Sequence, residues 1–412
     1  MLQVWAAALA LAVGQPAAAQ DAAAVVSADT ALAQDAAEVA RTRGIDPAEA
    51  LTLLRKQAAS IAVTEWVEGE YRDRVAGTVI ERDGAVTVLL TGTRPVPDGQ
   101  VAIDGLAIPI RFRTGATATR TQMLAAIAEH QAAIRAMVQR PPAMGIDARR
   151  GELLILIGAS DAAGDVAALK RRIESLTGVP VRIATSGRPE LDLSGEVVGG
   201  SRLIGPDPVS GRRFYCTTGF VVTDGAQTGI VTAAHCPDML DHVAKDGTRT
   251  PLAFIGQWGW GFQDVQVNAS PEAVQPRFFS NAATTVSRPV EGQRSRAGTR
   301  VGDILCHRGE HSGYSCAEVE MVDFAPSGDL CGGPCLPTWV AVAGPGCKGG
   351  DSGGPVFIGT TAIGLLKGAS YRPDGTCVFY YYMSLDFLPD GWRLVRTPDA
   401  FTMPGALPNS PR

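Results

Sequence analysis

The chain has 412 residues, of which 45% are hydrophobic and 19% are charged, and its formal net charge is -5. This composition supplies enough apolar side chains for packed cores and argues against a wholly disordered chain. The length predicts two or three domains. No stretch of Lys and Arg is dense enough to follow a phosphate backbone, which argues against nucleic-acid binding.

The N-terminus has the pattern of a signal peptide. A short apolar run over 4–13 precedes the small residues Ala17, Ala18 and Ala19. Such a run is too short to span a bilayer as a helix, and signal peptidase requires small residues at its cleavage site. We therefore expect residues 1–19 to be a cleaved signal peptide, with no membrane segment afterwards. An uncleaved anchor is the alternative.

Residues 20–142 are expected to form an α+β region. Asp46 followed by Pro47 indicates a helix start, because an aspartate oxygen can accept from unpaired backbone N–H groups and proline has the φ angle of a first helical residue. The β-rich runs within 77–92 flank an Asp-Gly pair and predict a hairpin. Thr121 is the expected N-cap of another helix, whose apolar stripe contains Leu124, Ile127, Ile134 and Val138.

Residues 143–195 have the pattern of a small β-α-β unit. Strands are expected over 152–157 and 181–184, with a helix over 163–176 between them. Neither this unit nor the region before it contains a catalytic constellation. His130 is the only histidine there and falls within a helical pattern, so we expect it to have a surface or packing role.

The sequence changes character after residue 187. Short β-rich runs alternate with clusters of Gly, Pro, Asp and Ser, as in all-β barrels and sandwiches. All eight cysteines lie between Cys216 and Cys377. An even number of cysteines confined to one half predicts a disulfide-bonded domain and an oxidising compartment. Residues 397–412 are rich in proline and are expected to form a tail.

Three short motifs in this half carry groups suited to acyl transfer. The motif TAAHC contains His235, the motif GGDSGGP contains Ser352, and Asp264 opens an alternating run between them. A serine hydroxyl is a poor nucleophile until a base removes its proton, which a neutral imidazole can do near pH 7. A buried carboxylate would hold the imidazole in the correct tautomer. Glycines around the serine let backbone N–H groups, here those of Gly350 and Ser352, face a developing oxyanion.

The order His, Asp, Ser, together with TAAHC and GDSGGP, resembles the chymotrypsin-fold serine peptidases. It is most similar to the secreted bacterial branch of α-lytic protease and the streptogrisins. The small loop from Cys306 to Cys316 and the run AIGL over 362–365 also match this branch. The resemblance covers residues 196–396. It implies that His235 is the general base and then acid, that Asp264 orients it, and that Ser352 attacks the scissile carbonyl.

The resemblance also implies a fold, a route of maturation and a set of partners. The fold would be all-β, with two six-stranded antiparallel Greek-key barrels preceded by an α+β pro-region that assists folding and inhibits the enzyme. The product would be an exported serine endopeptidase, secreted or periplasmic, monomeric, and made as a zymogen. Its partners would be a polypeptide substrate and its own pro-region, and it would need no cofactor or metal. Self-cleavage is expected between residues 187 and 201.

Further residues are assigned by the same resemblance. Asp351 is expected to form an ion pair with Arg308, or with the neighbouring His307, and Arg308 is preferred because it stays charged. Lys367, Gly368 and Ala369 are expected to bind an extended substrate strand. Relatives usually carry serine near the catalytic aspartate where this chain has Lys367, so the lysine could disturb the hydrogen bonds of the triad or favour an acidic group nearby. The implied disulfides are Cys216–Cys236, Cys306–Cys316, Cys331–Cys335 and Cys347–Cys377.

Several alternatives stay open. Cys306, His307, His311 and Cys316 form a ligand-like group that could hold zinc. The protease fold could be an inactive binding protein or an esterase-like hydrolase, and the first half could be an independent adhesion domain. Gly346 lies where trypsin-like enzymes carry the acid of the specificity pocket, so a small or medium apolar side chain is expected at the cleavage site.

Overall fold

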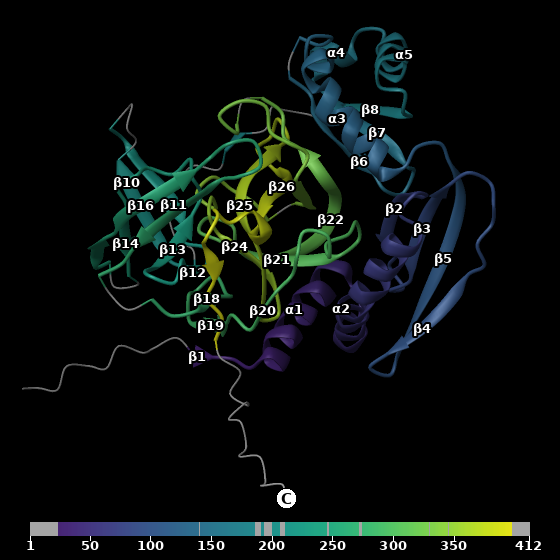
Figure 1. Ribbon diagram of the computed structural model, residues 1–412. Coiled ribbons are helices and arrows are strands. Elements are labelled where there is room, and N and C mark those ends of the chain that lie inside the picture. Colours follow the sequence, from purple (N-terminus) through teal and green to yellow (C-terminus); the bar gives the residue numbers. More distant parts are fainter. Residues whose placement is uncertain are drawn as a thin grey trace, which may run out of the picture.

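The computed structural model describes most of the chain between residues 24 and 397. The expected signal peptide (1–19) and nearly all of the expected tail lie outside the described residues, so both stay predictions. Figure 1 shows a β-rich body, coloured teal to yellow, beside the helices and smaller sheet of the N-terminal region, coloured purple to blue. The described ranges are 24–139, 141–185, 191–192, 200–206, 211–244, 247–271, 274–328, 330–344 and 346–397.

Residues 24–116 form two helices and a four-stranded sheet, after the two-residue strand β1. Asp46 caps the second helix as expected, because its carboxylate accepts a hydrogen bond from the Ala48 amide at 2.8 Å. The hairpin expected over 77–92 is present as β2 and β3, whereas the first helix was not expected from the sequence. The elements are β1 (Ala24–Val25), α1 (Ala28–Arg43), α2 (Pro47–Glu70), β2 (Val75–Ile80), β3 (Val86–Thr91), β4 (Gly99–Ile103) and β5 (Leu106–Ala116), with the sheet order β2-β3-β5-β4.

The next segment contains the β-α-β unit. Thr119, not Thr121, is the N-cap of helix α3, because Thr119 and Gln122 exchange side-chain to backbone hydrogen bonds in a capping box. The two strands of the unit, β7 and β8, are parallel as a crossover helix requires, and β6 adds an antiparallel strand. The elements are α3 (Arg120–Arg135), β6 (Ala143–Asp147), β7 (Glu152–Ile157), α4 (Ala159–Ala162), α5 (Val166–Thr177), β8 (Val181–Thr185) and β9 (Leu191–Asp192).

Six antiparallel strands of the C-terminal half close into a barrel. Their order is β21-β24-β25-β26-β23-β22, and β22 pairs again with β21. The core includes the fully buried side chains of Trp339, Phe357 and Tyr381. This confirms one of the two expected six-stranded barrels. The strands are β21 (Ile304–Gly309), β22 (Gly313–Ala325), β23 (Trp339–Ala343), β24 (Pro355–Ile358), β25 (Thr361–Tyr371) and β26 (Cys377–Ser384).

The strands before this barrel, together with β27 from the C-terminal end, pair as two sheets. Their orders are β11-β10-β14-β15 and β16-β17-β13-β12-β27. Pairings that would close them into one barrel do not occur among the described residues, so the second barrel stays a prediction. These strands are β10 (Arg202–Pro206), β11 (Arg213–Thr217), β12 (Val221–Thr223), β13 (Thr228–Thr232), β14 (Asp241–Val243), β15 (Arg249–Pro251), β16 (Ala253–Trp258), β17 (Val265–Ala269) and β27 (Arg393–Leu394). Short elements complete the fold: β18 (Arg277–Phe279), β19 (Val286–Pro289), β20 (Gly292–Gln293) and the 3-10 helix η1 (Leu385–Phe387).

The N-terminal region continues the sheet of the barrel. Strand β6 pairs with the end of β22 that extends beyond β21, through the pairs Val322–Ile146 and Ala325–Met144. Strands β7 and β8 follow β6 (Figure 1), and with β9 and β20, which both pair with β25, the sheet has 11 strands. Among the described residues, the helices are each too short or too polar to span a bilayer.

Candidate active site

Three side chains from distant parts of the chain form one hydrogen-bonded series. His235 Nε2 lies 2.8 Å from Ser352 Oγ, and His235 Nδ1 lies 2.9 Å from Asp264 Oδ2. The His235 amide also donates to Asp264 Oδ1 at 3.1 Å. Because both carboxylate oxygens bind the same histidine, its ring is held with Nε2 directed at the serine hydroxyl.

The strand register explains why the histidine and the aspartate meet. His235 follows the end of β13, and Asp264 directly precedes β17, which pairs with β13 through Thr232 and Gln266. The two residues therefore lie at the same end of two neighbouring strands. Asp264 is 2% exposed, and its amide donates to the sulfur of Met383.

Ser352 lies in the glycine-rich turn before β24. Gly353 has φ +83°, and a Cβ there would collide with Thr232 Oγ1, so this position accepts only glycine. Gly350 has φ +102°. The turn is anchored to the strands around it, since the Thr217 hydroxyl donates to the Gly350 carbonyl at 2.8 Å and the Thr217 amide donates to the Ser352 carbonyl at 2.8 Å.

Asp264 also contacts a buried cation. Lys367 Nζ lies 3.4 Å from Asp264 Oδ2, and both side chains are 2% exposed. Burial alone would raise the pKa of the Asp264 carboxyl, but the charges of His235 and Lys367 outweigh this and lower that pKa to about 2. The carboxylate is therefore ionised at every pH at which the protein would act.

The carboxylate of Asp351, next to the serine, is held by backbone amides. It accepts hydrogen bonds from the amides of Lys348, His311 and Ser312, at 2.7, 3.0 and 3.2 Å. Burial raises its pKa, and these donors oppose that shift. Among the described residues, Asp351 has no ion pair with a basic side chain within 4 Å.

This corrects the expected pairing of Asp351 with Arg308. The Arg308 guanidinium donates to the carbonyls of Asn281, Ala282 and Gly309. The alternative partner, His307, is buried against Tyr380, and burial together with the Arg308 charge lowers its pKa to about 3, so it is neutral. Backbone donors thus replace the side-chain cation that the resemblance implied.

The strand expected to bind substrate is already paired. Gly368 and Ala369 of β25 pair antiparallel with Asp192 and Leu191 of β9. The side chain of Lys367 is buried against Asp264. Its Nζ lies 5.6 Å from the centroid of the Trp339 ring. Lys367 can therefore offer its backbone to this edge, and the expectation that the backbone of 367–369 binds an extended substrate strand stays a prediction.

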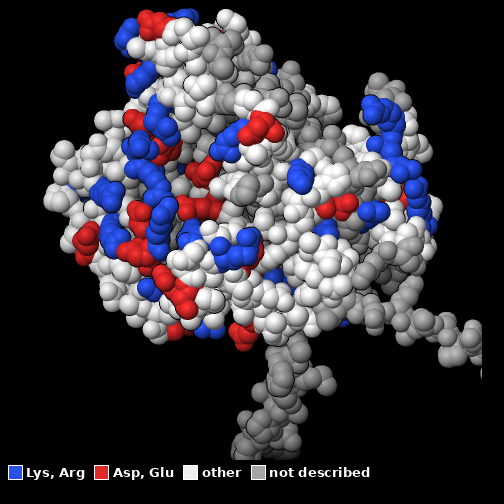
Figure 2. All heavy atoms as spheres, turned by 180° about the vertical axis from the view of Figure 1, so that it is seen from behind, with Lys and Arg blue, Asp and Glu red and all other residues white. Residues whose placement is uncertain are grey.

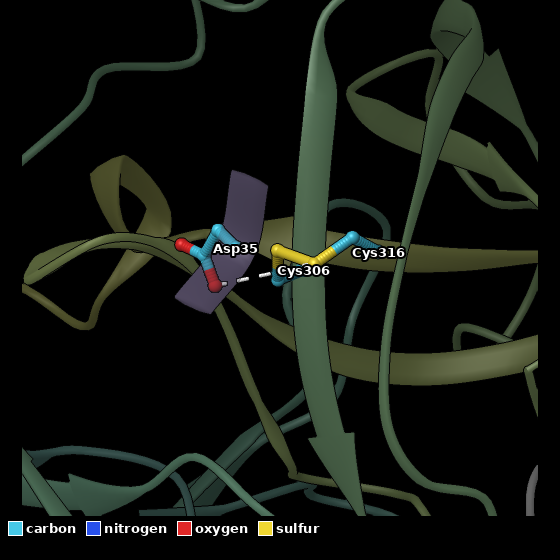
Figure 3. A group of neighbouring side chains, drawn as sticks. All are labelled: Asp35, Cys306 and Cys316. Atoms are coloured by element: carbon cyan, nitrogen blue, oxygen red, sulfur yellow. Dashed lines mark hydrogen bonds between the residues drawn. A yellow bond between two sulfur atoms is a disulfide. The ribbon is translucent and has the colours of Figure 1, made fainter. Parts of the chain in front are cut away.

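All eight cysteines form disulfides, in the four pairs expected from the resemblance. Asp35 lies beside the sulfurs of Cys306 and Cys316 in a compact group (Figure 3). Those two sulfurs are bonded to each other, so they offer no thiolate to a metal ion. This removes the donors on which the zinc alternative depended. His130, expected to be structural, lies within α3.

Comparison with known proteins finds bacterial serine proteases. Streptogrisin-C of Streptomyces griseus is 28% identical over 164 residues, which are 39% of this chain and 33% of that protein. Serine protease 1 of Streptomyces fradiae is 25% identical over 318 residues, which are 76% of this chain and 80% of that protein. The chain thus spans about a third of the length of streptogrisin-C. No family model matches the chain.

Solved structures resembling this fold include two bacterial proteases. Thermobifida fusca protease A has a TM-score of 0.38 and 22% identity, covering 49% of this chain and 100% of that one. A chymotrypsin of Cellulomonas bogoriensis has a TM-score of 0.37 and 20% identity, with the same coverage of 49% and 100%. The sequence relatives and the closed six-stranded barrel support a bacterial serine endopeptidase of the chymotrypsin fold.

Proposed function

We propose that this chain is an exported serine endopeptidase made as a zymogen. The observation that carries the proposal is the series from Ser352 through His235 to Asp264, with contacts of 2.8 and 2.9 Å. Its polypeptide substrates and its export follow from the bacterial serine proteases that the sequence resembles.

In the proposed mechanism, Ser352 Oγ attacks the scissile carbonyl while His235 Nε2 accepts its proton. Asp264 keeps the proton of His235 on Nδ1 and stabilises the imidazolium. The amides of Gly350 and Ser352 donate to the oxyanion that forms. His235 then protonates the leaving amine, and water hydrolyses the acyl-enzyme by the same steps in reverse order.

Residues 20–195 would be the pro-region, and the buried polar contacts of its described part with the barrel domain support this role. The Gln57 side chain of α2 bonds the backbone of Ile304 in both directions, donating at 3.1 Å and accepting at 2.7 Å. Arg300, 2% exposed, donates to the hydroxyls of Ser60 and Thr64. An independent adhesion domain would have no need of buried contacts that only this barrel satisfies.

Charged contacts border this interface. Arg43 and Arg149, both in the N-terminal region, lie 2.8 and 3.6 Å from the carboxylate of Glu318 on β22, and Arg120 lies 2.6 Å from Asp323. In Figure 2, basic and acidic side chains are mixed over the left half of the view. The many long-range contacts of the barrel form slowly. A pro-region that holds β22 in its final position through such pairs would therefore help the barrel to fold.

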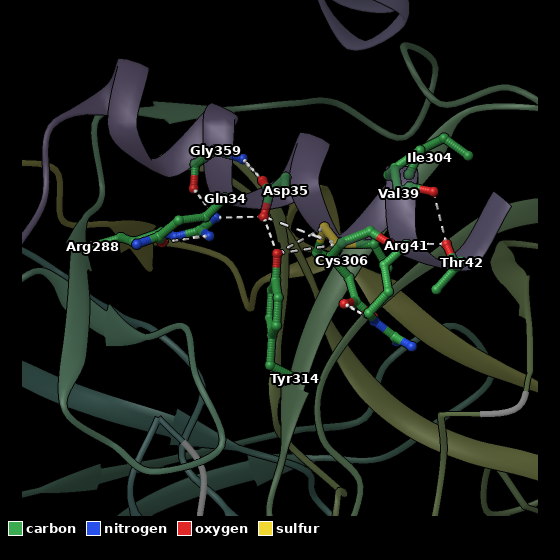
Figure 4. The surroundings of a disulfide bond; sticks show 12 residues. Gln34, Asp35, Val39, Arg41, Thr42, Arg288, Ile304, Cys306, Tyr314 and Gly359 are labelled. Carbon is green, nitrogen blue, oxygen red and sulfur yellow. Dashed lines mark hydrogen bonds and ion pairs between the residues drawn. A yellow bond between two sulfur atoms is a disulfide. The ribbon is translucent and has the colours of Figure 1, made fainter. Parts of the chain in front are cut away.

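The deepest contact of the proposed pro-region comes from α1. The Asp35 carboxylate lies 2.8 Å from Arg288 Nη1 and accepts from the Tyr314 hydroxyl and the Gly359 amide, each at 2.5 Å (Figure 4). Asp35 and Arg288 are both fully buried, and the Arg288 guanidinium also lies 5.1 Å from the centroid of the Phe357 ring. The carboxylate of one region thus neutralises a buried cation of the other.

The pairing of β9 with β25 indicates how the zymogen would be inhibited and cut. Leu191 is opposite Ala369 and Asp192 is opposite Gly368. Two residues beyond Gly368 in β25, the backbone of Leu366 bonds Gly353 and Gly354, directly after the serine. The segment therefore runs toward Ser352 in the way that an extended substrate would.

We predict that self-cleavage occurs after position 193, which lies outside the described residues. Cleavage there would leave Leu191 and Asp192, which pair with β25, on the acyl side of the cut bond. N-terminal sequencing of the purified product should therefore begin at Ser194. Leu193→Asp should slow processing by at least about tenfold if the pocket is apolar, whereas Arg188→Asp, farther from the predicted cut along the chain, should not. A product that begins beyond 187–201 would contradict this prediction.

Two other functions would give different results. An inactive binding protein on this scaffold would not react with a fluorophosphonate, which labels an activated serine. An esterase-like hydrolase would be labelled but would not cleave a peptide library. We expect both labelling and cleavage with small or medium apolar residues preferred, and labelled protein that cleaves no peptide would leave the esterase as the function.

A further inference from the structure

Lys367 is an unusual neighbour for a catalytic aspartate. Its Nζ lies 3.4 Å from Asp264 Oδ2, the same oxygen that His235 Nδ1 contacts at 2.9 Å. Its other described contact is the ring of Trp339, which is fully buried. One carboxylate oxygen is thus shared between an ammonium and an imidazole in a site that solvent barely reaches.

We propose that Lys367 is a positioning residue that extends the activity of this enzyme to more acidic pH. The inference rests on the proposed function, since it concerns the same histidine and serine. The side chain of Lys367 acts through Asp264 and touches neither the substrate nor the reacting atoms. Its ammonium competes with the imidazolium for the carboxylate, so that His235 remains neutral, and able to accept the serine proton, at lower pH.

The direction of this effect follows from elementary electrostatics. A carboxylate beside an imidazole favours its protonated form, and a cation nearby disfavours it. Lys367 offsets part of the stabilisation that Asp264 gives to the imidazolium. The rate of acylation rises as pH increases through the point where His235 loses its proton, so Lys367 moves that rise to lower pH. The same ammonium weakens transition-state stabilisation, which lowers the maximal rate.

Within the described parts of the chain, few charged groups act on Asp264. Among the described residues, the charged or titratable groups that act on Asp264 are His235 and Lys367. Its remaining contact, the sulfur of Met383, is neutral, as is the Trp339 ring beside Lys367. Buried charges are screened much less than surface charges, so the effect should persist at physiological salt.

The geometry also separates this role from substrate recognition. A lysine that selected acidic substrates would have to present its ammonium to the pocket. The Lys367 side chain is 2% exposed, and its ammonium contacts the carboxylate of Asp264. An acidic residue at the cleavage site is therefore not expected to be preferred, and replacing Lys367 should alter the pH profile more than it alters the order of substrate preference.

The test is the pH dependence of kcat/KM for a neutral peptide substrate, between pH 4 and 9, on the protein to which the full chain matures. Lys367→Met removes the charge and keeps the length, and Lys367→Arg keeps the charge. We expect Lys367→Met to move the midpoint of the acidic limb upward by about one pH unit, so that well below it the variant retains about tenfold less of its own maximal rate. Lys367→Arg should stay within about 0.3 unit of the wild type.

A purely structural lysine would give another result. Lys367→Met would then lower the maximal rate and leave the midpoint unchanged, which would overturn the inference. If Lys367→Met does not fold, Lys367→Ser, the residue that relatives usually carry, removes the same charge and is measured in its place, and an unchanged midpoint of fluorophosphonate labelling would overturn the inference. A wild type labelled at no pH would overturn the proposed function itself.

Discussion

Replacing Ser352 with alanine is expected to abolish both peptide cleavage and maturation. The hydroxyl that His235 contacts at 2.8 Å is the proposed nucleophile, and no acyl-enzyme forms without it. Loss of such a nucleophile lowers kcat by about 10⁴- to 10⁶-fold in serine proteases. The measurement is peptide hydrolysis with fluorophosphonate labelling, together with the mass of the accumulated chain, which should remain at the length of the unprocessed precursor.

A matched control is available in the same domain. Ser280 is also buried, 3% exposed, and lies outside the hydrogen-bonded series. Ser280→Ala should be labelled, processed and active at close to the wild-type rate. If Ser352→Ala still matured at the wild-type rate in pure form, cleavage would be the work of another protease, and the zymogen proposal would have to be abandoned.

Replacing Asp35 with alanine is expected to destabilise the intact precursor by about 3–5 kcal/mol. This substitution leaves the Arg288 guanidinium buried without its carboxylate, and an uncompensated buried charge costs about that much. The measurement is urea unfolding of the full chain in the Ser352→Ala background, which keeps the two regions covalently joined. In the wild-type background the same substitution should reduce the yield of mature enzyme.

Two further variants separate the buried pair from general damage to α1. Glu38→Ala removes a carboxylate from the same helix, but one that pairs with the exposed Arg41, and should cost less than about 1 kcal/mol. The double variant Asp35→Ala with Arg288→Met should be more stable than Asp35→Ala alone, because no unpaired charge remains. Equal losses for Asp35→Ala and Glu38→Ala would refute the assigned role of the pair.

The site could be predicted from the sequence where chemistry follows from local motifs. His235 and Ser352 each lie within a motif that few other sites share, and Asp264 opens a strand whose register with β13 brings it to the histidine. The four disulfides could be chosen from many possible pairings only through the resemblance to known proteases. That Asp46 caps a helix could be predicted from the residues around it, since a cap bonds to neighbours along the chain.

The errors concern contacts between distant residues. The resemblance placed a basic side chain on Asp351, but the chain supplies three backbone amides instead, and no sequence pattern distinguishes these solutions. Asp35 is one acid in a weakly amphipathic segment, so nothing marks it as the partner of Arg288, 253 residues away. The resemblance already placed Lys367 near the catalytic aspartate, but the burial of its ammonium and the 3.4 Å contact with Asp264 required the fold.

The pairing of β6 with β22 has a consequence for the enzyme after maturation. If residues 20–195 leave as the proposed pro-region, the edge of β22 around Val322 to Ala325 loses its partner strand, and such edges recruit other chains into aggregates. Asp323 lies in this stretch, and Arg296 of the protease domain itself contacts its carboxylate. The charge of Asp323, which would help to hold the pro-region, would thus remain at the strand edge after maturation and oppose self-association. The same residue would serve first in assembly and later in solubility.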